Sequence, residues 1–152
     1  MEKTLEVAKT LSHMFHEYTG EPIDEMKTHK LMYFAQRESL MEKEEPLFDG
    51  TFYGYKYGPV LKEIREEFKK EHPFADVPET KSKYAESVLK KVLDRYGKLS
   101  AWKLSGLSHR EFSWKMARKG MDSKVDGDVS LDPAAMKIDA IKERIERRSE
   151  SA

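Results

Sequence analysis

The sequence predicts a mainly α fold, a compact bundle of five to seven helices with a small extended element after the second helix. Apolar residues recur every three or four positions over most of the 152-residue chain, which is the periodicity of amphipathic helices. Glycine and proline separate these runs, and one stretch, 51–58, alternates in the manner of a strand. No internal repeat or long linker is present, so we expect a single domain over 1–148 and a frayed tail at 149–152.

The composition narrows the class of partner. The chain has 28 basic and 28 acidic residues, which argues against nucleic acid as the main partner because phosphate binding favours a basic surface. It has no cysteine, so disulfides, cysteine-ligated zinc and thiol catalysis are excluded. No apolar run reaches the roughly 20 residues of a membrane helix, and Met1–Leu5 lack the features of a signal peptide. We therefore expect a cytoplasmic protein without a membrane partner.

The first predicted helix spans residues 3–18 and stops at Gly20. Its apolar face consists of Val7, Leu11, Met14 and Tyr18. His13 and His16 lie outside this face. Two histidines three positions apart are able to hold a metal, but no third ligand is evident, and a solvated polar face is the better interpretation.

The second predicted helix begins after Asp24, a good cap residue, and runs to about Lys43. Its middle, Leu31–Ala35, is apolar on every side, which indicates a helix that is buried all round. His29 and Arg37 border this middle and are its most notable polar positions.

The alternating stretch after this helix is the clearest departure from helical periodicity. In an extended chain, one face carries Thr51, Tyr53, Tyr55 and Tyr57, and the other carries Gly50, Phe52, Gly54, Lys56 and Gly58. Only one face belongs to the core, so either the tyrosines or Phe52 and Lys56 look outward. A free strand edge here would also be able to extend the sheet of a partner.

Three further helices are expected in the middle of the chain. Pro59 fits the first turn of a helix over 60–68, whose charged residues, Glu67 among them, face water. After an irregular loop at 72–80, a helix opens at Thr80 or Ser82 and closes at Gly97. A short helix then runs from Ser100 to about Gly106.

The C-terminal third begins with a capping-box pattern, Ser108–Glu111, which predicts the start of a helix that reaches about Lys119. A polar, turn-rich segment covers 120–131. Asp132 and Pro133 then open the last helix. Its apolar stripe is expected at Ala134, Ile138, Ile141 and Ile145.

The sequence contains no recognisable catalytic constellation. Glycines recur every four residues over 50–58, but no Gly-Lys-Ser/Thr follows them as in a phosphate-binding loop. A calcium loop starting at Asp122 fails because Lys124 and Pro133 occupy two ligand positions. Ser113 and His109 lack an orienting third group and are interpreted as a surface pair. We therefore expect a binding protein that is not an enzyme, with no catalytic residue, cofactor or metal.

Three segments of the chain resemble a known family. Residues 26–36, MKTHKLMYFAQ, resemble its K-L-x-K-L-L-Y-Y-A-Q helix. Residues 46–49 and 55–60, PLFD and YKYGPV, resemble its P-L-F-D … W-x-Y-G-P-V block. Residues 107–111 and 114–118, LSHRE and WKMAR, resemble its L-T-H-x-E … P-W-x-x-A-R segment. Because the order and spacing agree over nearly the whole chain, the sequence is identified as a member of the Panacea, or SocA-like, antitoxin family, which phages and mobile elements often carry.

The resemblance implies a domain that neutralises a toxin protein encoded nearby by binding it directly, without catalysis. Tyrosine, tryptophan and arginine often anchor interfaces because they combine a large area with a polar group. The predicted partner-binding residues are Tyr53, Tyr55, Lys56 and Tyr57, followed by His109, Arg110 and Trp114. Tyr55 stands where the family has tryptophan and Ser113 where it has proline, so the identity of the partner does not carry over.

Alternatives of other classes stay open at this stage. Some members of the family deliver their toxin to a protease as adaptors, and a phage–host interaction protein would use the same fold. An enzyme or small-molecule binder would need a deep pocket with convergent polar groups. DNA-binding autoregulation would need a helix-turn-helix module, which is not evident. The sequence does not specify the toxin or the oligomeric state.

Overall fold

The computed structural model describes residues 1–151. Within them the chain forms seven helices and one two-stranded antiparallel sheet, which confirms the predicted mainly α class. The elements are α1 (Thr4–Thr19), α2 (Glu25–Lys43), β1 (Phe52–Tyr55), β2 (Gly58–Leu61), α3 (Lys62–Phe68), α4 (Lys83–Tyr96), α5 (Ala101–Ser108), α6 (Phe112–Ala117) and α7 (Pro133–Ser151). None of these helices is both long and apolar enough to cross a membrane. Helix α7 continues past residue 148, and the domain limits stay a prediction.

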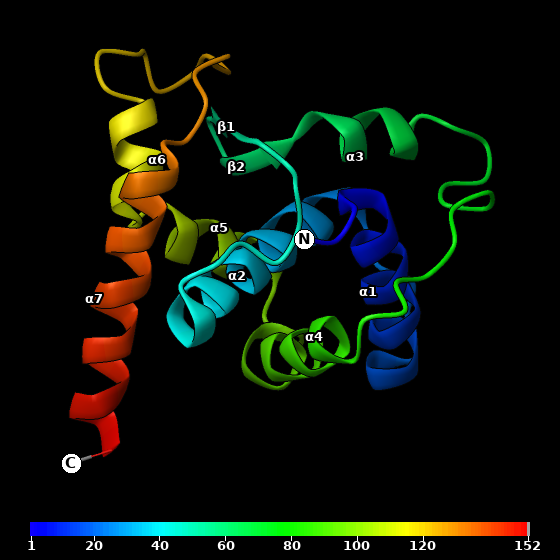
Figure 1. Cartoon of the computed structure of the whole chain (residues 1–152). Helices are drawn as coiled ribbons and strands as arrows, with labels where there is room; N and C mark the ends of the chain where they lie inside the picture. Colours follow the sequence, from blue (N-terminus) through cyan, green and yellow to red (C-terminus); the bar gives the residue numbers. More distant parts are fainter. Residues whose placement is uncertain (152) are drawn as a thin grey trace.

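Helix α2 runs through the centre of the molecule, between α1, α4 and α7 (Figure 1). Every residue from Thr28 to Met41 is buried, so the helix has partners on all sides, as its apolar middle predicted. Its start is also confirmed, because the Asp24 carboxylate accepts a hydrogen bond from the Lys27 amide at 2.8 Å. Glu44 ends the helix in a left-handed conformation.

The alternating stretch forms a β-hairpin at one end of the bundle, next to α3 and α6 (Figure 1). Tyr55 pairs with Gly58, so Lys56 and Tyr57 form a two-residue turn. Gly58 has a φ of 125°, a region that favours glycine, and a Cβ there would lie 2.6 Å from Ser108 Oγ. The glycine therefore permits both the turn and its close approach to α5.

The expected position of Pro59 in the first turn of a helix is wrong. Pro59 pairs with Gly54 inside β2, and α3 begins at Lys62. Proline fits this position because an edge strand does not need every N–H donor. The nearby Leu61 amide donates to His29 Nδ1 at 3.2 Å, which closes this edge of the hairpin against α2.

The opposite edge of the hairpin is closed by the segment before α7. The Gly54 amide donates to the Val129 carbonyl at 2.9 Å, and the Leu131 amide donates to the Phe52 carbonyl at 2.8 Å. Within the described residues the hairpin therefore has both edges occupied, and the idea that it extends a partner's sheet has no support here. Phe52 and Gly54 face the core, while the strand tyrosines are half-buried on the outer face. The core thus takes the Phe52 face, one of the two options that the alternation allowed.

Glu67 is buried, contrary to the expectation that the charged residues of this helix face water. Its carboxylate accepts hydrogen bonds from the Phe74 amide at 2.7 Å and from Lys70 Nζ at 3.0 Å. Burial works to raise the pKa of Glu67, but these hydrogen bonds hold it below its ordinary value. The carboxylate therefore fastens the irregular loop after α3, where Phe74 has a φ of 64°.

The predicted capping box at Ser108–Glu111 is also wrong. Helix α5 continues to Ser108, beyond its expected end near Gly106, and Ser108 Oγ donates to the Ser105 carbonyl at 2.8 Å within the same helix. Helix α6 begins only at Phe112. The local pattern failed because the Glu111 carboxylate makes a long-range ion pair instead of capping a helix.

The apolar stripe expected to attach the last helix to the core faces solvent instead. The start of α7 is as predicted, because Asp132 Oδ1 accepts from the Ala134 amide at 2.8 Å. However, Ile138, Ile141 and Ile145 are 41%, 49% and 56% exposed. The buried residues of α7 are Ala135, Met136, Asp139 and Ala140. Polar contacts with α2 and α6, described below, decide this orientation.

Candidate functional site

The tip of the hairpin is fastened to two helices through one carbonyl group. Lys30 Nζ from α2 and Ser105 Oγ from α5 both donate to the Tyr57 carbonyl oxygen, each at 2.7 Å. Lys30 is buried, and burial lowers its pKa to about 8. These bonds use only the backbone of Tyr57, so its side chain is free to face outward.

A stacked pair of rings, one from the residue that follows α5 and one from α6, lies beside this tip. The rings of His109 and Trp114 are 4.1 Å apart and within 8° of parallel. Trp114 Nε1 donates to the Tyr55 carbonyl at 2.8 Å, which ties the pair to the hairpin. Burial and the nearby Lys30 charge lower the pKa of His109, so the ring favours its neutral form.

Two aromatic side chains remain prominent on this surface. Tyr57 is 45% exposed and Trp102 of α5 is 66% exposed, and their rings meet edge to face at 5.5 Å. Together with the stacked pair they line a groove of about 580 Å³. We call it the aromatic groove, and its main side chains are Lys56, Tyr57, Trp102, His109, Trp114 and Arg118.

Arg118 organises the loop that borders the aromatic groove. Its guanidinium donates to the Gly54 carbonyl at 3.0 Å and to the Asp122 carbonyl at 2.9 Å, and it also bonds to the Val125 carbonyl. Gly54 allows α6 to come this close, because a Cβ there would lie 3.0 Å from the Ala117 Cβ. One side chain therefore joins the polar 120–131 segment to the hairpin and to α6.

The structure brings together four of the seven predicted partner-binding residues. Lys56, Tyr57, His109 and Trp114 all line the aromatic groove. Tyr55 lies next to it and contacts it through its carbonyl, while its ring packs 5.2 Å from the Arg65 guanidinium. The hairpin turn is what gathers these residues, since it carries Lys56 and Tyr57 out of the strand alternation.

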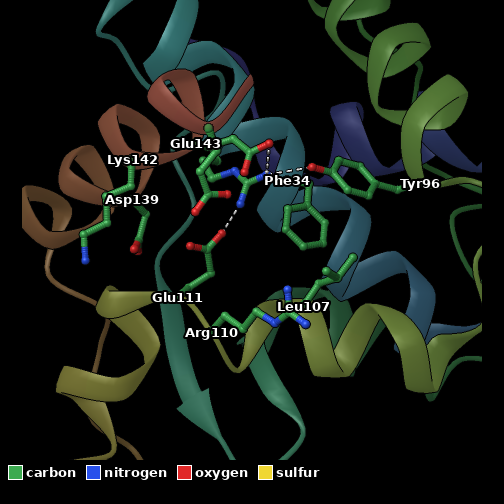
Figure 2. A pocket seen from close by; sticks show the side chains of 10 residues that line it. Phe34, Tyr96, Leu107, Arg110, Glu111, Asp139, Lys142 and Glu143 are labelled. Atoms are coloured by element: carbon green, nitrogen blue, oxygen red, sulfur yellow. Dashed lines mark hydrogen bonds and ion pairs between the residues drawn. The ribbon is translucent and has the colours of Figure 1, made fainter. Parts of the chain in front are cut away.

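Two predicted residues lie elsewhere. The Tyr53 ring lies under Lys62 Nζ at 4.1 Å, outside the aromatic groove. Arg110 lines a different cavity between α2, α4, α5 and α7 (Figure 2). Sequence reasoning also missed Trp102 and Arg118, which the structure adds to the groove. Arg118 had a signal in the sequence, since it is the last residue of the WKMAR segment that resembles the family motif, whereas no pattern in the sequence indicated that Trp102 is exposed.

Arg37 is the centre of a buried polar cluster, which we call the Arg37 cluster (Figure 2). Its guanidinium donates hydrogen bonds to the Glu111 carboxylate and to Tyr96 Oη at 2.7 Å, and it forms an ion pair with Glu143 at 3.6 Å. Burial raises the pKa of Glu111 to about 7, with Asp139 adding to the effect and Arg37 opposing it. The adjoining cavity measures about 140 Å³, which is below the roughly 300 Å³ of a small-molecule site. The cluster therefore serves to join helices.

Asp139 of α7 provides the cap that the sequence pattern assigned to Ser108. Its two carboxylate oxygens accept from the amides of Phe112 and Ser113 at 2.7 and 2.9 Å, at the start of α6. Tyr33 of α2 also donates to Asp139, at 3.2 Å. One carboxylate therefore connects α2, α6 and α7.

Ser113 and His109, which the sequence analysis considered as a nucleophile and a base, make contacts with different residues. Ser113 is buried, and its Oγ lies 3.0 Å from the Tyr33 hydroxyl, while His109 stacks on Trp114. In residues 1–151 no group of three or more potential ligands is arranged to hold a metal ion. His13, one of the two histidines considered as ligands, pairs instead with Glu17 and Glu79.

Comparison with known families decides the identification. The model of the family described as "Antitoxin SocA-like, Panacea domain" matches residues 29–115, more than half of the chain. The chain belongs to this antitoxin family. No curated protein and no solved structure matches it significantly.

The matched part of this Panacea protein runs from His29 in α2 to Lys115 in α6. It contains the hairpin, α5 and most of the aromatic groove, as well as Arg37 of the buried cluster. Helix α7 lies beyond it. Membership of the family supports an antitoxin role, suggests that the role is not catalytic and implies a toxin as the general class of partner.

Proposed function

We propose that this Panacea protein neutralises a toxin encoded beside it by binding the toxin directly through the aromatic groove, in the cytoplasm and without catalysis. The observation that carries the proposal is the exposed pair of Tyr57 and Trp102 on a part of the fold that the family match covers. Exposed tyrosine and tryptophan side chains are the residues that most often anchor protein interfaces.

The rigidity of the groove supports this function. Lys30 and Ser105 hold the hairpin tip, Trp114 bonds to the hairpin, and Arg118 fastens the neighbouring loop. A surface that is already ordered loses little conformational entropy on binding, so more of its contact energy contributes to affinity. The side chains gathered here are suited to burial against a protein and have no orienting partners of the kind that catalysis requires.

The test is co-expression with the product of the adjacent open reading frame, with growth rescue and co-purification as readouts. The variant with Tyr57→Ala and Trp102→Ala should lose rescue and should bind the toxin at least about tenfold more weakly. It should keep its fold, because the hairpin is fastened through the Tyr57 backbone. Tyr18→Ala, at a tyrosine that is 39% exposed on α1, is the matched control and should rescue normally.

The outcomes separate the function from the surface. If the wild-type protein neither rescues growth nor co-purifies with the neighbouring product, the antitoxin role of this chain is wrong. If the wild type rescues and the double variant rescues equally well, toxin binding stands and the aromatic groove is the wrong surface. If rescue requires an active host protease, the adaptor mechanism replaces direct inhibition.

A further inference from the structure

The outer face of α7 carries an apolar stripe that has no partner in the described chain. Ile138, Ile141 and Ile145 are each 41% or more exposed. Asp139, Glu143 and Arg147 occupy the opposite side of the same helix and bond to α2 or α6. At 3.6 residues per turn, the isoleucine stripe points directly away from the core. This arrangement is the reverse of a helix that buries its apolar face within its own domain.

The spacing of the stripe indicates the shape of the occupant. The isoleucines are separated by three and then four residues, and Ala134 continues the pattern four residues earlier. This is the a and d spacing of a coiled-coil seam, which is narrower than the face a helix turns toward a globular core. A narrow seam of β-branched side chains fits the ridge of a second helix.

The charges beside the stripe indicate the chemistry of the occupant. The exposed Lys137 flanks it on one side and the exposed Lys142 on the other, and Arg148 extends the seam toward the C-terminus. Arg144, on the side of Lys137, is half-buried and donates to the Met41 carbonyl at 3.3 Å. In a helix pair these flanking positions face the partner and select its charge. A second copy of α7 would place like charges against each other in either orientation. The complementary occupant is a helix with acidic residues beside its apolar seam.

We propose that the outer face of α7 binds an acidic amphipathic helix of a partner protein, packed alongside α7 as a two-helix pair. The inference concerns a surface separate from the aromatic groove and does not depend on the antitoxin role. An anionic membrane would also attract the lysines, but a helix that lies on a membrane uses a wide apolar face, often with aromatic residues. The seam of α7 is narrow and has no aromatic residue.

The probe for the test is a fluorescein-labelled heptad peptide with isoleucine and leucine at a and d and glutamate at e and g, whose charges keep it from self-pairing. A reference peptide has lysine at e and g. In fluorescence anisotropy the full chain should bind the acidic peptide at least about tenfold more tightly than the basic one. Ile141→Asp should weaken this binding about tenfold or more, because a charge then enters the seam. Val125→Asp, at a valine that is 54% exposed in a loop, is the matched control and should bind like the wild type.

Charge reversal provides the sharper arm of the test. The variant with Lys137→Glu and Lys142→Glu should lose the preference for the acidic peptide and gain affinity for the basic one. Both side chains are exposed, so unchanged circular dichroism should show that the fold is kept. Equal binding of both peptides by the wild type would overturn the proposal. So would a dimer in sedimentation that Ile141→Asp dissociates, or binding to phosphatidylglycerol vesicles without binding to either peptide.

Discussion

Helix α2 is held on its two sides by different kinds of contact. On the side of α1 and α4, most of the buried contacts are apolar, and they come from Val7, Leu11, Val88, Leu89 and Val92. The polar contacts on this side are fewer and include Arg37 with Tyr96 and Glu42 with Lys91, both partners being in α4. On the side of α7, three polar pairs join the helices, namely Tyr33–Asp139, Arg37–Glu143 and Glu38–Arg147. The first side depends on excluded water and close packing, whereas the second depends on each charge having its partner.

The difference shows how one helix can be attached with few buried apolar side chains, since polar pairs accompany the buried Ala135, Met136 and Ala140 of α7. The α7 side places the carboxylates Glu38, Glu111, Asp139 and Glu143 around two arginines, Arg37 and Arg147. Burial raises the pKa of one of these carboxylates, Glu111, to about 7, and the neighbouring Asp139 carboxylate adds to this effect while Arg37 opposes it. The attachment of α7 should therefore respond to pH and to charge substitutions, while the packing of α1 and α4 should not. Four measurements test this comparison.

Arg37→Ala should have the largest effect. The substitution leaves Glu111 and Glu143 in a buried site without their common cation, so the free energy of unfolding should fall by about 3–5 kcal/mol. Urea denaturation measures this fall. Lys142→Ala, at an exposed residue on the same cavity, is the control and should change stability by less than about 0.5 kcal/mol. A fall below about 1 kcal/mol for Arg37→Ala would contradict a charge-dependent attachment.

Leu89→Ala should come next and should represent the apolar side. Leu89 is fully buried, so removal of its side chain leaves a cavity and should cost about 3 kcal/mol. The same denaturation experiment at about pH 5 and about pH 8 should give the same loss, because no titrating group is involved. Lys90→Ala, one residue further on the exposed face, is the control. A strongly pH-dependent loss for Leu89→Ala would remove the distinction between the two sides.

The free energy of unfolding should change with pH because the Glu111 carboxyl group titrates. Its pKa in the folded state is about 7, above the ordinary 4.5, so the folded protein holds this proton more tightly than the unfolded chain does. The stability it contributes is present below about pH 4.5 and is lost as the pH rises through about 7, a change of about 3 kcal/mol.

Glu111→Gln should therefore flatten the fall in stability over this range of pH. The quantity to compare is the difference between variant and wild type, because His29, whose pKa burial lowers, changes stability in the opposite direction. Glu146→Gln, at an exposed carboxylate on the same cavity, should leave the profile unchanged. Parallel profiles for wild type and Glu111→Gln would show that Glu111 titrates normally.

Asp139→Asn should have the smallest effect of the four. Asparagine keeps one acceptor oxygen where aspartate has two, so one of the two amides at the start of α6 loses its bond, at about 1 kcal/mol. Hydrogen exchange at Phe112 and Ser113 should become faster. Asp132→Asn is the matched control, because that cap uses a single side-chain bond that asparagine can replace. Unchanged exchange in Asp139→Asn would mean that α6 is stabilised by packing alone.

Local signals in the sequence predicted most of the elements correctly. The caps Asp24 and Ser82 lie where the structure places the starts of α2 and α4, and Gly20 ends α1 as expected. The alternation over 51–58 predicted an extended element, and the hairpin is there. These signals succeed because a cap, a turn or a helical stripe involves residues only a few positions apart.

The errors have a common physical cause. Pro59 looked like a helix start but pairs inside a strand, and Glu67 looked exposed but accepts a bond from the Phe74 amide in the following loop. The capping box failed because Glu111 pairs with Arg37, which is far away in the chain, while Ser108 bonds within its own helix. The isoleucine stripe of α7 has the spacing of a buried face but is exposed. The contacts of Asp139 with α6 and of Glu143 with α2 turn the opposite face of the helix toward the core. A hydrogen-bonded contact leaves no periodic trace in the chain, so pattern reasoning cannot find it.

Some residues of the candidate site were likewise predictable from the sequence, and others only from the structure. The sequence predicted Tyr57, His109 and Trp114 from separate segments that resemble the family motif. The structure brings these three side chains into one groove. Trp102 and Arg118 could join the groove only through the folded arrangement of α5 and α6 around the hairpin.

The sequence by itself therefore determined the helical class, most element boundaries and membership of the Panacea family, because these are recorded in residue types at short spacing. Only the tertiary structure decided which side of α7 faces the core and how the aromatic groove is assembled. Both depend on contacts between residues far apart in the chain, such as Asp139 with Tyr33 and Trp114 with Tyr55. These contacts stabilise the fold only when both partners are brought together, so no short segment of the sequence reveals them.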